Sequence, residues 1–306
     1  MKLTYTILAA VVLTFTAFAK KPVTVWTDPV KANAEHSKFK FVGEYSNAQK
    51  TAFHQVSLMK TDDYLVSTYK AGLPGRGWDK SAVDSRILSQ EKLDALLKDA
   101  VKTNYISPTI GKKAPEGAVT MPEGFTKVKD GILWAGGQSN DSFGSFKMHL
   151  EFRLPFKPMR NPSNQDKGNS GIYIFNNYEI QVLDTFALDY SAEEYPFKTE
   201  SHRKQWCGCF YKMQMADVNA TLPALTWQTY DIDFTAPVFI DDKKVVNARI
   251  TVLHNGIKIH DDVELKNGTG NGGRRKQLAR GPIYFQDHGN PTAFRNVWIQ
   301  ETKLTK

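Results

Sequence analysis

The chain has 306 residues, of which 41% are hydrophobic and 24% are charged, and its formal net charge is +8. These proportions are typical of a globular protein and exclude an intrinsically disordered or fibrous chain. The basic residues are spread along the sequence, and their one cluster, Arg274–Lys276, lies in a glycine-rich stretch, so we expect no nucleic-acid partner.

Residues 1–19 have the pattern of a signal peptide. Lys2 precedes an apolar run from Leu3 to Phe18, and the segment ends in Ala17-Phe18-Ala19, a small-x-small pattern. Signal peptides are cut after such a pattern, so we predict cleavage after Ala19 and a secreted or periplasmic protein. The run is short for a membrane helix, and no other long apolar stretch follows it, so we expect no membrane span in the mature protein.

Residues 20–115 are predicted to form a small α+β region ahead of the main domain. Residues 20–37 are expected to be irregular, whereas Phe39–Val42 and Tyr64–Tyr69 are rich in the β-branched and aromatic residues of strands. Ser89 is a helix-capping residue type and predicts the start of a helix. The helix is indicated by apolar residues at helical spacing, namely Leu93, Leu96, Leu97 and Val101.

A stretch rich in Pro, Gly and Lys, residues 107–122, is predicted to link this region to a second domain at residues 120–304. From Phe125 onward, short runs with strand-like composition alternate with turns, and Asn255-Gly256 is a strong hairpin signal. The candidate strands are Leu133–Ala135, Phe146–Arg153, Gly171–Phe175, Tyr178–Leu183, Cys209–Lys212, Trp227–Phe234, Ala248–His254, Ile257–His260, Ile283–Gln286 and Phe294–Ile299. We therefore predict a mainly β protein with an antiparallel sandwich or jelly roll.

The two cysteines, Cys207 and Cys209, stand two positions apart. A disulfide at this spacing needs a strained loop, and no pair of histidines stands nearby to complete a zinc site. We predict that both are free thiols, with a disulfide between them as the minor alternative.

Alternation along four predicted strands, at residues 146–153, 171–175, 178–183 and 283–286, places polar side chains of catalytic type opposite the core. The residues expected on this opposite face are His149, Glu151, Arg153, Tyr173, Glu179, Gln181, Gln286 and His288. If the four strands share one sheet, these residues form a polar concave floor. The alternative is that each group is the solvated face of a half-exposed strand, although Glu and His are not favoured strand residues.

Glu179, Gln181 and Asp184 are spaced like the catalytic residues of retaining β-glucanases with a concanavalin-like fold. In those enzymes a bulge returns the last residue to the face of the first two, and the outer pair are nucleophile and acid/base. Here the middle residue is Gln and the last is Asp. The spacing therefore indicates the usual position of a site in that fold and disfavours glucanase chemistry.

Several segments follow one another in an order that resembles a known family. They are Gly144–Arg153, Gly168–Tyr173, Tyr178–Asp184, Trp227–Asp231, Val252–Gly256, Gly281–Asn290 and Phe294–Ile299. Together they resemble the 3-keto-disaccharide hydrolase family over residues 123–303, with Ser145 standing where that family usually has an acidic residue. The resemblance implies a concanavalin A-like jelly roll and action on sugars that carry a ketone at carbon 3.

That substrate implies a mechanism. A base removes the acidic proton from carbon 2, the anomeric substituent is eliminated from carbon 1, and water adds back. Glu179 or His288 is the predicted base, and Asp184 is either an acid/base or a turn residue. The predicted substrate-binding residues are Arg153, Gln181, Tyr173, Gln286 and Asn169. Arg153 has an alternative as the ion-pair partner of Glu151, and Asn169 as a residue that shapes its loop.

A divalent metal ion bound to the keto and neighbouring hydroxyl oxygens would stabilise the enediolate. The candidate ligands are His149, Glu151, Glu179 and His288. No other cofactor is expected, and the predicted partner is a small-molecule saccharide.

Three rival functions remain open on the sequence. A non-catalytic carbohydrate-binding module would use aromatic residues such as Trp134, Tyr173 and Trp206. A scaffold domain would show an exposed apolar patch. A conventional glucanase would need two carboxylates at the site.

Overall fold

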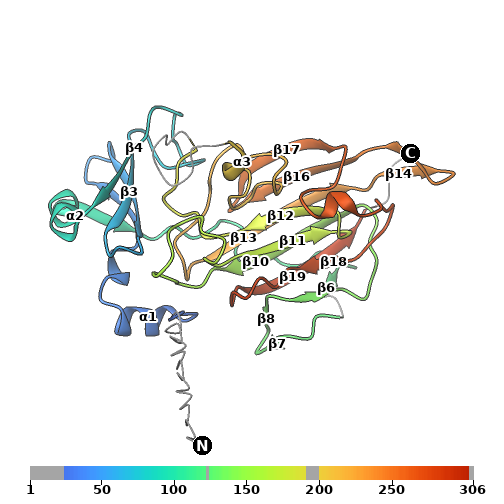
Figure 1. Cartoon of the computed structure of the whole chain (residues 1–306), viewed down its shortest axis with the longest axis horizontal. Coiled ribbons are helices and arrows are strands. Elements are labelled where there is room, and N and C mark those ends of the chain that lie inside the picture. Colours follow the sequence, from blue (N-terminus) through green and yellow to red (C-terminus); the bar gives the residue numbers. More distant parts are fainter. Residues whose placement is uncertain (1–23, 122–123, 191–199, 303–306) are drawn as a thin grey trace, which may run out of the picture.

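The computed structural model describes residues 24–121, 124–190 and 200–302. Within them the protein is mainly β, with a small N-terminal sheet beside a larger two-sheet sandwich (Figure 1). The predicted mainly β, antiparallel architecture is confirmed, and no helix in the described ranges is long and apolar enough to cross a membrane. The predicted signal peptide lies outside the described residues.

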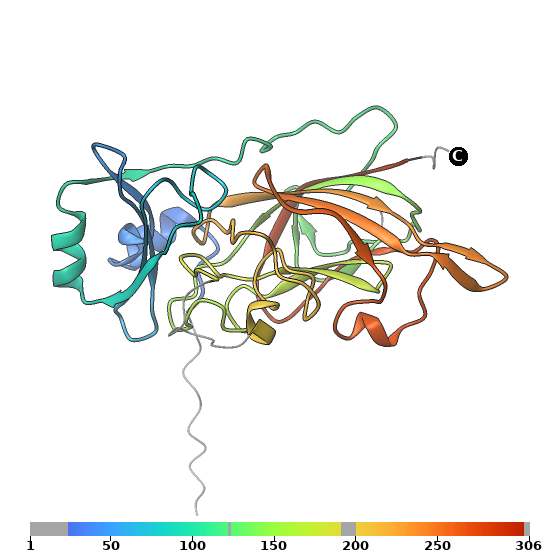
Figure 2. The ribbon, with the colours of Figure 1, turned by 90° about the horizontal axis from the view of Figure 1, so that it is seen from above.

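A five-stranded antiparallel sheet, in the order β4-β3-β2-β1-β5, forms the N-terminal region. Its strands are β1 (Gly43–Asn47), β2 (Phe53–Leu58), β3 (Tyr64–Tyr69), β4 (Asp84–Leu88) and β5 (Ala100–Thr103). Helix α2 (Gln90–Leu97) joins β4 to β5 on the side away from the sandwich, and its Leu93 is buried (Figure 2).

Residues 20–37, which precede this sheet, were predicted to be irregular, but the described part of them contains a helix. Helix α1 (Pro29–Glu35) forms there because Asp28 caps it by accepting a hydrogen bond from the Lys31 amide at 2.9 Å, and because Pro29 suits the first helical position. The short 3-10 helix η1 (Phe39–Phe41) replaces the strand predicted over Phe39–Val42.

The helix predicted through Val101 ends earlier, at Leu97. Val101 lies instead in β5, where it is paired with Ser46 of β1. A β-branched residue suits this edge strand better than the end of a helix. Helical spacing alone therefore predicts a helix that is four residues too long.

Two sheets make up the sandwich. The large sheet has the order β17-β16-β13-β10-β19-β8-β7, with β6 also paired to β19, and the small sheet has the order β12-β11-β18-β9. The large sheet contains β6 (Val119–Thr120), β7 (Val128–Lys129), β8 (Ile132–Trp134), β10 (Phe146–Arg153), β13 (Trp227–Thr235), β16 (Ala248–His254), β17 (Ile257–Leu265) and β19 (Ala293–Glu301). The small sheet contains β9 (Gly137–Gln138), β11 (Ser170–Ile174), β12 (Tyr178–Val182) and β18 (Ile283–Phe285).

Other short elements lie outside these sheets. They are the hairpin β14 (Val238–Ile240) and β15 (Lys243–Val246), helix α3 (Glu200–Arg203) and the 3-10 helix η2 (Gly272–Arg274).

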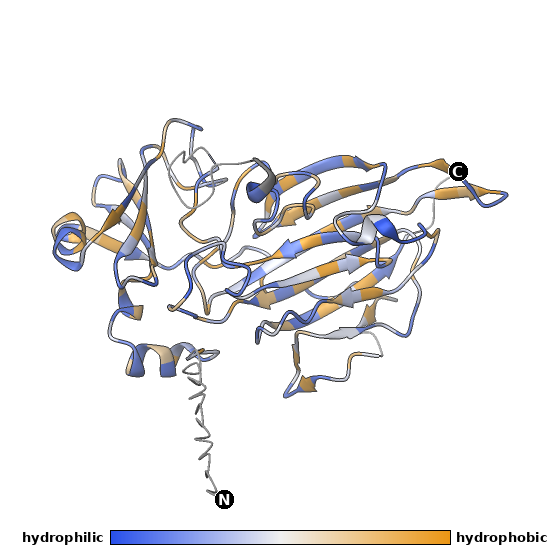
Figure 3. Ribbon diagram, in the orientation of Figure 1, coloured by the Kyte–Doolittle hydropathy of each residue, from blue (hydrophilic) through white to orange (hydrophobic). Residues whose placement is uncertain are grey.

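The core lies between the two sheets of the sandwich. Alternate residues of β10 and β11, such as Leu150 and Ile172, are fully buried in it, and Phe285 of β18 stacks on Phe294 of β19 with ring centroids 4.6 Å apart. The alternation of hydrophobic and hydrophilic residues is visible along the strands (Figure 3). Each sheet therefore has its own outward face, and the two faces point in opposite directions.

Two local predictions for the sandwich are confirmed and one is wrong. Asn255 and Gly256, with φ values of 53° and 76°, make the tight turn between β16 and β17. Cys207 and Cys209 are free and buried. The strand predicted over Cys209–Lys212 is absent: Phe210 makes isolated bridges to Ile180 and Gln214, and turns flank it.

The predicted linker crosses the outward face of the large sheet. We call residues 107–117 the strap; Figure 2 shows it running along the sandwich from the N-terminal sheet. The strap is bound at both ends and in the middle: Ser107 Oγ lies 2.7 Å from Thr229 Oγ1, the Gly111 amide donates to Glu151 at 2.7 Å, and Gln300 donates to the Glu116 carbonyl at 3.1 Å.

Candidate active site

A narrow pocket lies on the outward face of the small sheet, and we call it the deep pocket. Its volume is about 80 Å³. The residues lining it are Gln165, Asn169, Tyr173, Glu179, Gln181, Tyr211, Asn271, Gln286 and His288. Six of the residues predicted from the sequence therefore meet here, since strands β11, β12 and the end of β18 lie side by side in one sheet.

Glu179 is positioned by strand β11. Tyr173 stands opposite it in the register of β11 and β12, and its hydroxyl donates a hydrogen bond to Glu179 Oε2 at 2.7 Å. Gly171 leaves room for the carboxyl group, because a Cβ at that position would lie 2.5 Å from Glu179 Oε1. Among the described residues, Oε1 has no hydrogen-bond partner, so one carboxyl oxygen is held and the other is available.

The surroundings of Glu179 change its acidity. Burial raises the pKa of Glu179 to about 7, although the hydrogen bond from Tyr173 and the positive charge of Lys212 act in the opposite direction. Burial and the neighbouring Glu179 also raise the pKa of Tyr173 far above its usual value, so its hydroxyl remains a donor. A carboxyl group that titrates near neutral pH is suited to move a proton in either direction.

Three amide side chains of the deep pocket contain buried atoms that no described residue satisfies. They are both amide atoms of Gln181, Oε1 of Gln286 and Oδ1 of Asn169. Buried polar atoms in proteins are almost always hydrogen-bonded. Because these atoms belong to residues that line the pocket, a ligand with several hydroxyl or carbonyl groups would satisfy them.

A second, wider pocket adjoins the first, and we call it the wide pocket. Its volume is about 580 Å³, and it shares Gln165 and His288 with the deep pocket. His288, which is exposed, follows strand β18 and therefore stands at the boundary between the two pockets.

The polar floor predicted as one surface is divided between two sheets. His149, Glu151 and Arg153 lie on β10 in the large sheet, whereas Glu179 and Gln181 lie on β12 in the small sheet. Because these sheets face each other across the core, their outward residues are on opposite sides of the sandwich. Strand alternation identifies the face of each strand but not the sheet that the strand joins.

His149 and Glu151 are buried beneath the strap. Nδ1 of His149 lies 3.0 Å from Asp231 Oδ1, and Glu151 accepts hydrogen bonds from Arg295 at 2.7 Å and from the Gly111 amide. Glu151 thus fastens the strap to the sheet directly, whereas His149 contacts Asp231, which in turn pairs with Lys112 of the strap at 2.7 Å.

Arg153 and Asp184 also have structural surroundings. The Arg153 guanidinium lies over the ring of Trp227, 4.7 Å from its centre, and Glu151 pairs with Arg295 rather than with Arg153. Asp184 is buried, lies 3.4 Å from Lys167 Nζ and accepts a hydrogen bond from the Phe186 amide. Of its two predicted roles, the turn residue fits this geometry.

The four predicted metal ligands do not come together. His149 and Glu151 lie under the strap, and Glu179 and His288 line the deep pocket on the other side of the sandwich. Within the described ranges, no three His, Cys, Asp or Glu side chains are close enough to hold an ion. The predicted four-residue set therefore does not fit one metal ion.

The sequence did not identify three residues of the deep pocket. Gln165, Tyr211 and Asn271 reach it from loops rather than from strands of the small sheet. Gln165 is fixed by Asn169, whose amide donates to both its carbonyl and its side-chain oxygen at 3.0 Å. No periodic pattern marks such loop residues, and only the tertiary arrangement places them.

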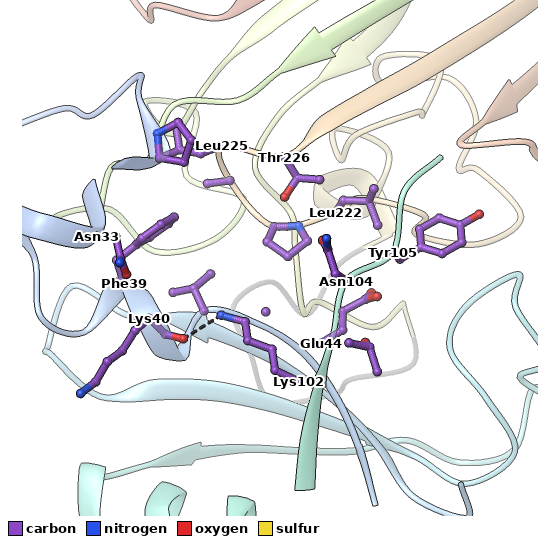
Figure 4. Close-up of a pocket in the computed structure, with 16 residues that line it drawn as sticks. Asn33, Phe39, Lys40, Glu44, Lys102, Asn104, Tyr105, Leu222, Leu225 and Thr226 are labelled. Carbon is purple, nitrogen blue, oxygen red and sulfur yellow. Dashed lines mark hydrogen bonds between the residues drawn. The ribbon is translucent and has the colours of Figure 1, made fainter. Parts of the chain in front are cut away.

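Another cavity, of about 210 Å³, lies between the N-terminal sheet and the loop at residues 222–226 (Figure 4). Lys102 points across it and donates to the Lys40 carbonyl at 2.7 Å. The carboxylate that lines this cavity, Glu44, is paired with Arg76 through two contacts at 2.8 and 2.5 Å. Its described lining residues include no histidine, so acid–base chemistry is better supported in the deep pocket.

Comparison with known proteins places the chain in a family. The profile of the 3-keto-alpha-glucoside-1,2-lyase-like domain matches residues 100–300. No curated protein sequence matches the chain.

Three solved structures from Parabacteroides distasonis, each named as a candidate glycosyl hydrolase, are similar to it. The first is 29% identical, covers 62% of this chain and 85% of its own, and has a TM-score of 0.49. The second is 17% identical, with 58% and 85% coverage and a TM-score of 0.40. The third is 19% identical, with 61% and 94% coverage and a TM-score of 0.38. Since the profile matches well over half of the chain and agrees with the ordered motifs, this protein belongs to the 3-keto-alpha-glucoside-1,2-lyase-like family.

Proposed function

We propose that this protein is a carbohydrate-active enzyme that cleaves the glycosidic bond of 3-keto-glycosides by elimination followed by addition of water. The observation that carries the proposal is Glu179, a buried carboxyl group with a pKa of about 7 that lines a pocket of unsatisfied amides. Family membership supports the class of substrate.

The reaction balances without an oxidant or reductant. The ketone at carbon 3 makes the proton on carbon 2 acidic, and a base removes it. The electron pair of that C–H bond forms a double bond between carbons 1 and 2 while the C1–O bond breaks, and the departing oxygen takes a proton. Water then adds its hydroxyl group to carbon 1 and a proton to carbon 2, which completes a net hydrolysis.

The deep pocket contains groups for each proton transfer. Ionised Glu179 is the base: Tyr173 holds Oε2, which leaves Oε1 for the carbon-2 proton. Gln181, whose amide has no described partner, is a donor for the oxygen at carbon 3, where negative charge develops. His288, at the boundary with the wide pocket, is the acid for the departing oxygen. A base with a pKa near the working pH combines a useful ionised fraction with adequate basicity.

The rival functions have less support from the geometry. Of the aromatic residues that a binding module would use, Tyr173 lines the deep pocket, whereas Trp206 is buried and stacked on Tyr190 with centroids 4.9 Å apart. A retaining glucanase needs a second carboxylate roughly 5 Å from the first. Asp184, the residue at that sequence position, is paired with Lys167 and does not line the pocket.

The proposal predicts a large loss of activity in Glu179→Gln. Wild type should release product from 3-ketosucrose or a methyl 3-keto-glucoside, and Glu179→Gln should reduce kcat by roughly 10²–10⁴-fold, the usual contribution of a general base. Glutamine keeps the size of the side chain and an acceptor for Tyr173, so the pocket should stay intact. The matched control is Glu91→Gln on the exposed first turn of α2, which should be as active as wild type.

Turnover by Glu179→Gln at the wild-type rate would contradict the role of this residue. No turnover of any 3-keto-glycoside by wild type, with sugar binding retained, would favour the binding-module alternative.

A further inference from the structure

Two loops that reach the deep pocket carry basic residues. Tyr211 and Asn271, which line the pocket, come from these loops, and they are followed in the sequence by Lys212 and by the cluster Arg274–Lys276. This cluster is the one concentration of basic residues in the sequence, and the proposed reaction gives it no role. We call Lys212, Arg274 and Arg275 the basic rim.

Both loops are fastened to strand β12 beside Glu179. The Tyr211 amide donates to the Glu179 carbonyl at 3.2 Å, and Thr269 Oγ1 accepts from the Glu179 amide at 2.7 Å. The loops also contact each other, because a Cβ at Gly270 would lie 2.7 Å from the Tyr211 ring. The backbone that carries the basic rim is therefore held next to the candidate site.

The charges of the basic rim act on the pocket. Lys212 Nζ lies over the ring of Tyr211, 5.2 Å from its centre. Burial is the largest influence on the pKa of Glu179 and on the pKa of Tyr173, and it raises both, whereas Lys212 lowers the first and Arg275 lowers the second. An anionic group held at the pocket would therefore be attracted by both cations.

The basic rim has no counterion among the described residues. Lys276, the next residue in the sequence, lies 3.5 Å from Asp242, whereas the three residues of the rim form no ion pair in the described part of the chain. All three are exposed. Unpaired cations beside a pocket raise the local concentration of anionic ligands and favour their binding.

The deep pocket accommodates only part of a sugar ring. Its volume of about 80 Å³ is well below the usual range of roughly 300–1,000 Å³ for small-molecule sites. In a pyranose, carbon 5 lies across the ring from carbon 2. A ring that presents carbon 2 to Glu179 therefore directs carbon 5 and its substituent, carbon 6, out of the pocket, where the substituent can reach the basic rim.

We propose that the basic rim binds an anionic group at carbon 6 of the 3-keto sugar, so that the preferred substrates are glycosides of an acidic sugar. The anionic group is the carboxylate of a uronic acid or a phosphate ester, and both present negatively charged oxygens to Lys and Arg. This inference rests on the proposed function, because it specifies the sugar that occupies the same deep pocket.

The test uses three substrates that differ only at carbon 6. They are methyl 3-keto-glucoside, methyl 3-keto-glucuronide and the 6-phosphate of the first. The variants are Arg275→Gln and the double variant Lys212→Gln/Arg275→Gln, and the control is Lys92→Gln, at an exposed position of α2. The readout is the ratio of kcat/KM for an acidic substrate to kcat/KM for the neutral one, in which the effect of Lys212 on Glu179 cancels.

Wild type should prefer at least one acidic substrate by about tenfold or more. Arg275→Gln should reduce that preference roughly two- to fivefold, which is the usual size for an exposed ion pair, and the double variant should reduce it roughly tenfold. The preference should also weaken as NaCl is raised from about 0.05 to about 0.5 M, because salt screens exposed charges. Lys92→Gln should match wild type, and thermal unfolding should confirm that every variant is folded.

A higher kcat/KM for the glucuronide identifies the carboxylate as the anionic group, and a higher value for the 6-phosphate identifies the phosphate. Equal kcat/KM for the neutral and both acidic substrates in wild type, or a preference that survives in the double variant, would overturn the role of the basic rim. Turnover of the neutral substrate would still uphold the proposed function.

A wild-type protein that converts none of the three substrates would overturn the proposed function. Calorimetric titration with methyl glucuronide, the sugar without its ketone, then tests the basic rim by itself. Salt-sensitive binding that the double variant loses would support the rim, and the absence of binding to wild type would overturn it.

Discussion

The pKa of Glu179 is set by the residues that surround it in the fold. Burial raises its pKa from 4.5 to about 7, and the Tyr173 hydrogen bond limits that rise by favouring the ionised form. Between these two pH values the folded protein keeps a proton that the unfolded chain has lost. The contribution of Glu179 to the free energy of unfolding therefore decreases as the pH rises through this window. Burying this carboxyl group at the candidate site thus destabilises the fold at neutral pH.

Tyr173→Phe tests this arrangement through the pH dependence of activity. Without the hydroxyl, the ionised form of Glu179 loses a hydrogen bond, so its pKa should rise further. In wild type kcat/KM should increase as the pH rises through about 7, and in Tyr173→Phe that increase should occur at higher pH. The measurement is the kcat/KM profile from pH 5 to pH 9. Tyr178→Phe, on the same strand as Glu179 but facing the core, is the control, and an acid limb at the same pH in all three proteins would contradict the prediction.

At the scale of elements, the strap is held by a buried charged cluster. Burial lowers the pKa of His149, but its contacts with Asp231 and Glu151 outweigh that effect and raise it. Nε2 of His149 lies 4.0 Å from Glu151 Oε1, so the effect of that carboxylate is Coulombic. Burial acts to raise the pKa of Glu151, yet His149, Gly111, Arg295 and their neighbours lower it to about 2. Lys112 adds a contact at 2.7 Å from the strap to Asp231.

Glu151→Gln should loosen the strap far more than Lys112→Ala. The first change replaces the buried carboxylate that accepts hydrogen bonds from Gly111 and Arg295, and it should lower the free energy of unfolding by about 1.5–3 kcal/mol. The second removes a half-exposed partner and should cost about 1 kcal/mol or less. Urea unfolding measures both, and hydrogen exchange over residues 107–117 locates the effect. Similar losses in the two variants would contradict the buried role of Glu151.

The strap should also respond to pH through His149. Its folded pKa is raised, so its stabilising charge is fully present below the unfolded value of 6.5 and is lost as the pH rises through the folded value. Protection of the strap amides, corrected for the intrinsic exchange rate, is therefore expected to decrease on the alkaline side of that value.

At the scale of the whole molecule, the N-terminal region is fastened to the sandwich by aromatic packing as well as by the strap. Trp26 and Phe156 exchange two backbone hydrogen bonds at 3.0 and 2.9 Å, and the Phe156 ring lies 4.7 Å from that of Phe39. Ser67 of β3 donates to the Ala187 carbonyl of the sandwich at 2.7 Å. The family match begins at residue 100, so these contacts join the family domain to the region that precedes it.

Phe156→Ala should destabilise this junction without altering the deep pocket. The ring is buried among Trp26, His36 and Phe39, so its removal leaves a cavity and should cost about 3–5 kcal/mol in urea unfolding. Met159→Ala, at a side chain that is 54% exposed, should change stability by less than about 0.5 kcal/mol. KM for a 3-keto-glucoside should stay at the wild-type value in both variants. A loss below about 1 kcal/mol in Phe156→Ala would show that the junction contributes little.

The class of fold and the faces to which side chains point on the main strands of the sandwich can be predicted from the sequence alone. Because successive residues of a strand point to opposite faces, the alternation around Glu179 and Gln181 was enough to place both opposite the core. The Asn255-Gly256 turn is also predictable from the sequence, because few pairs of residues readily adopt positive φ at two successive positions and Asn-Gly is one of them. These features depend on neighbours within a few positions of the chain.

Long-range contacts determine which strands share a sheet and which groups are buried. His149 and Glu151 have the same local pattern as Glu179, but long-range pairing places β10 in the large sheet, where the strap covers them. The pKa of Glu179 depends on burial that loops from distant parts of the chain provide, and Gln165 and Tyr211 reach the pocket on such loops. Sheet partnership and burial arise from contacts between residues far apart in sequence, and no local period records them.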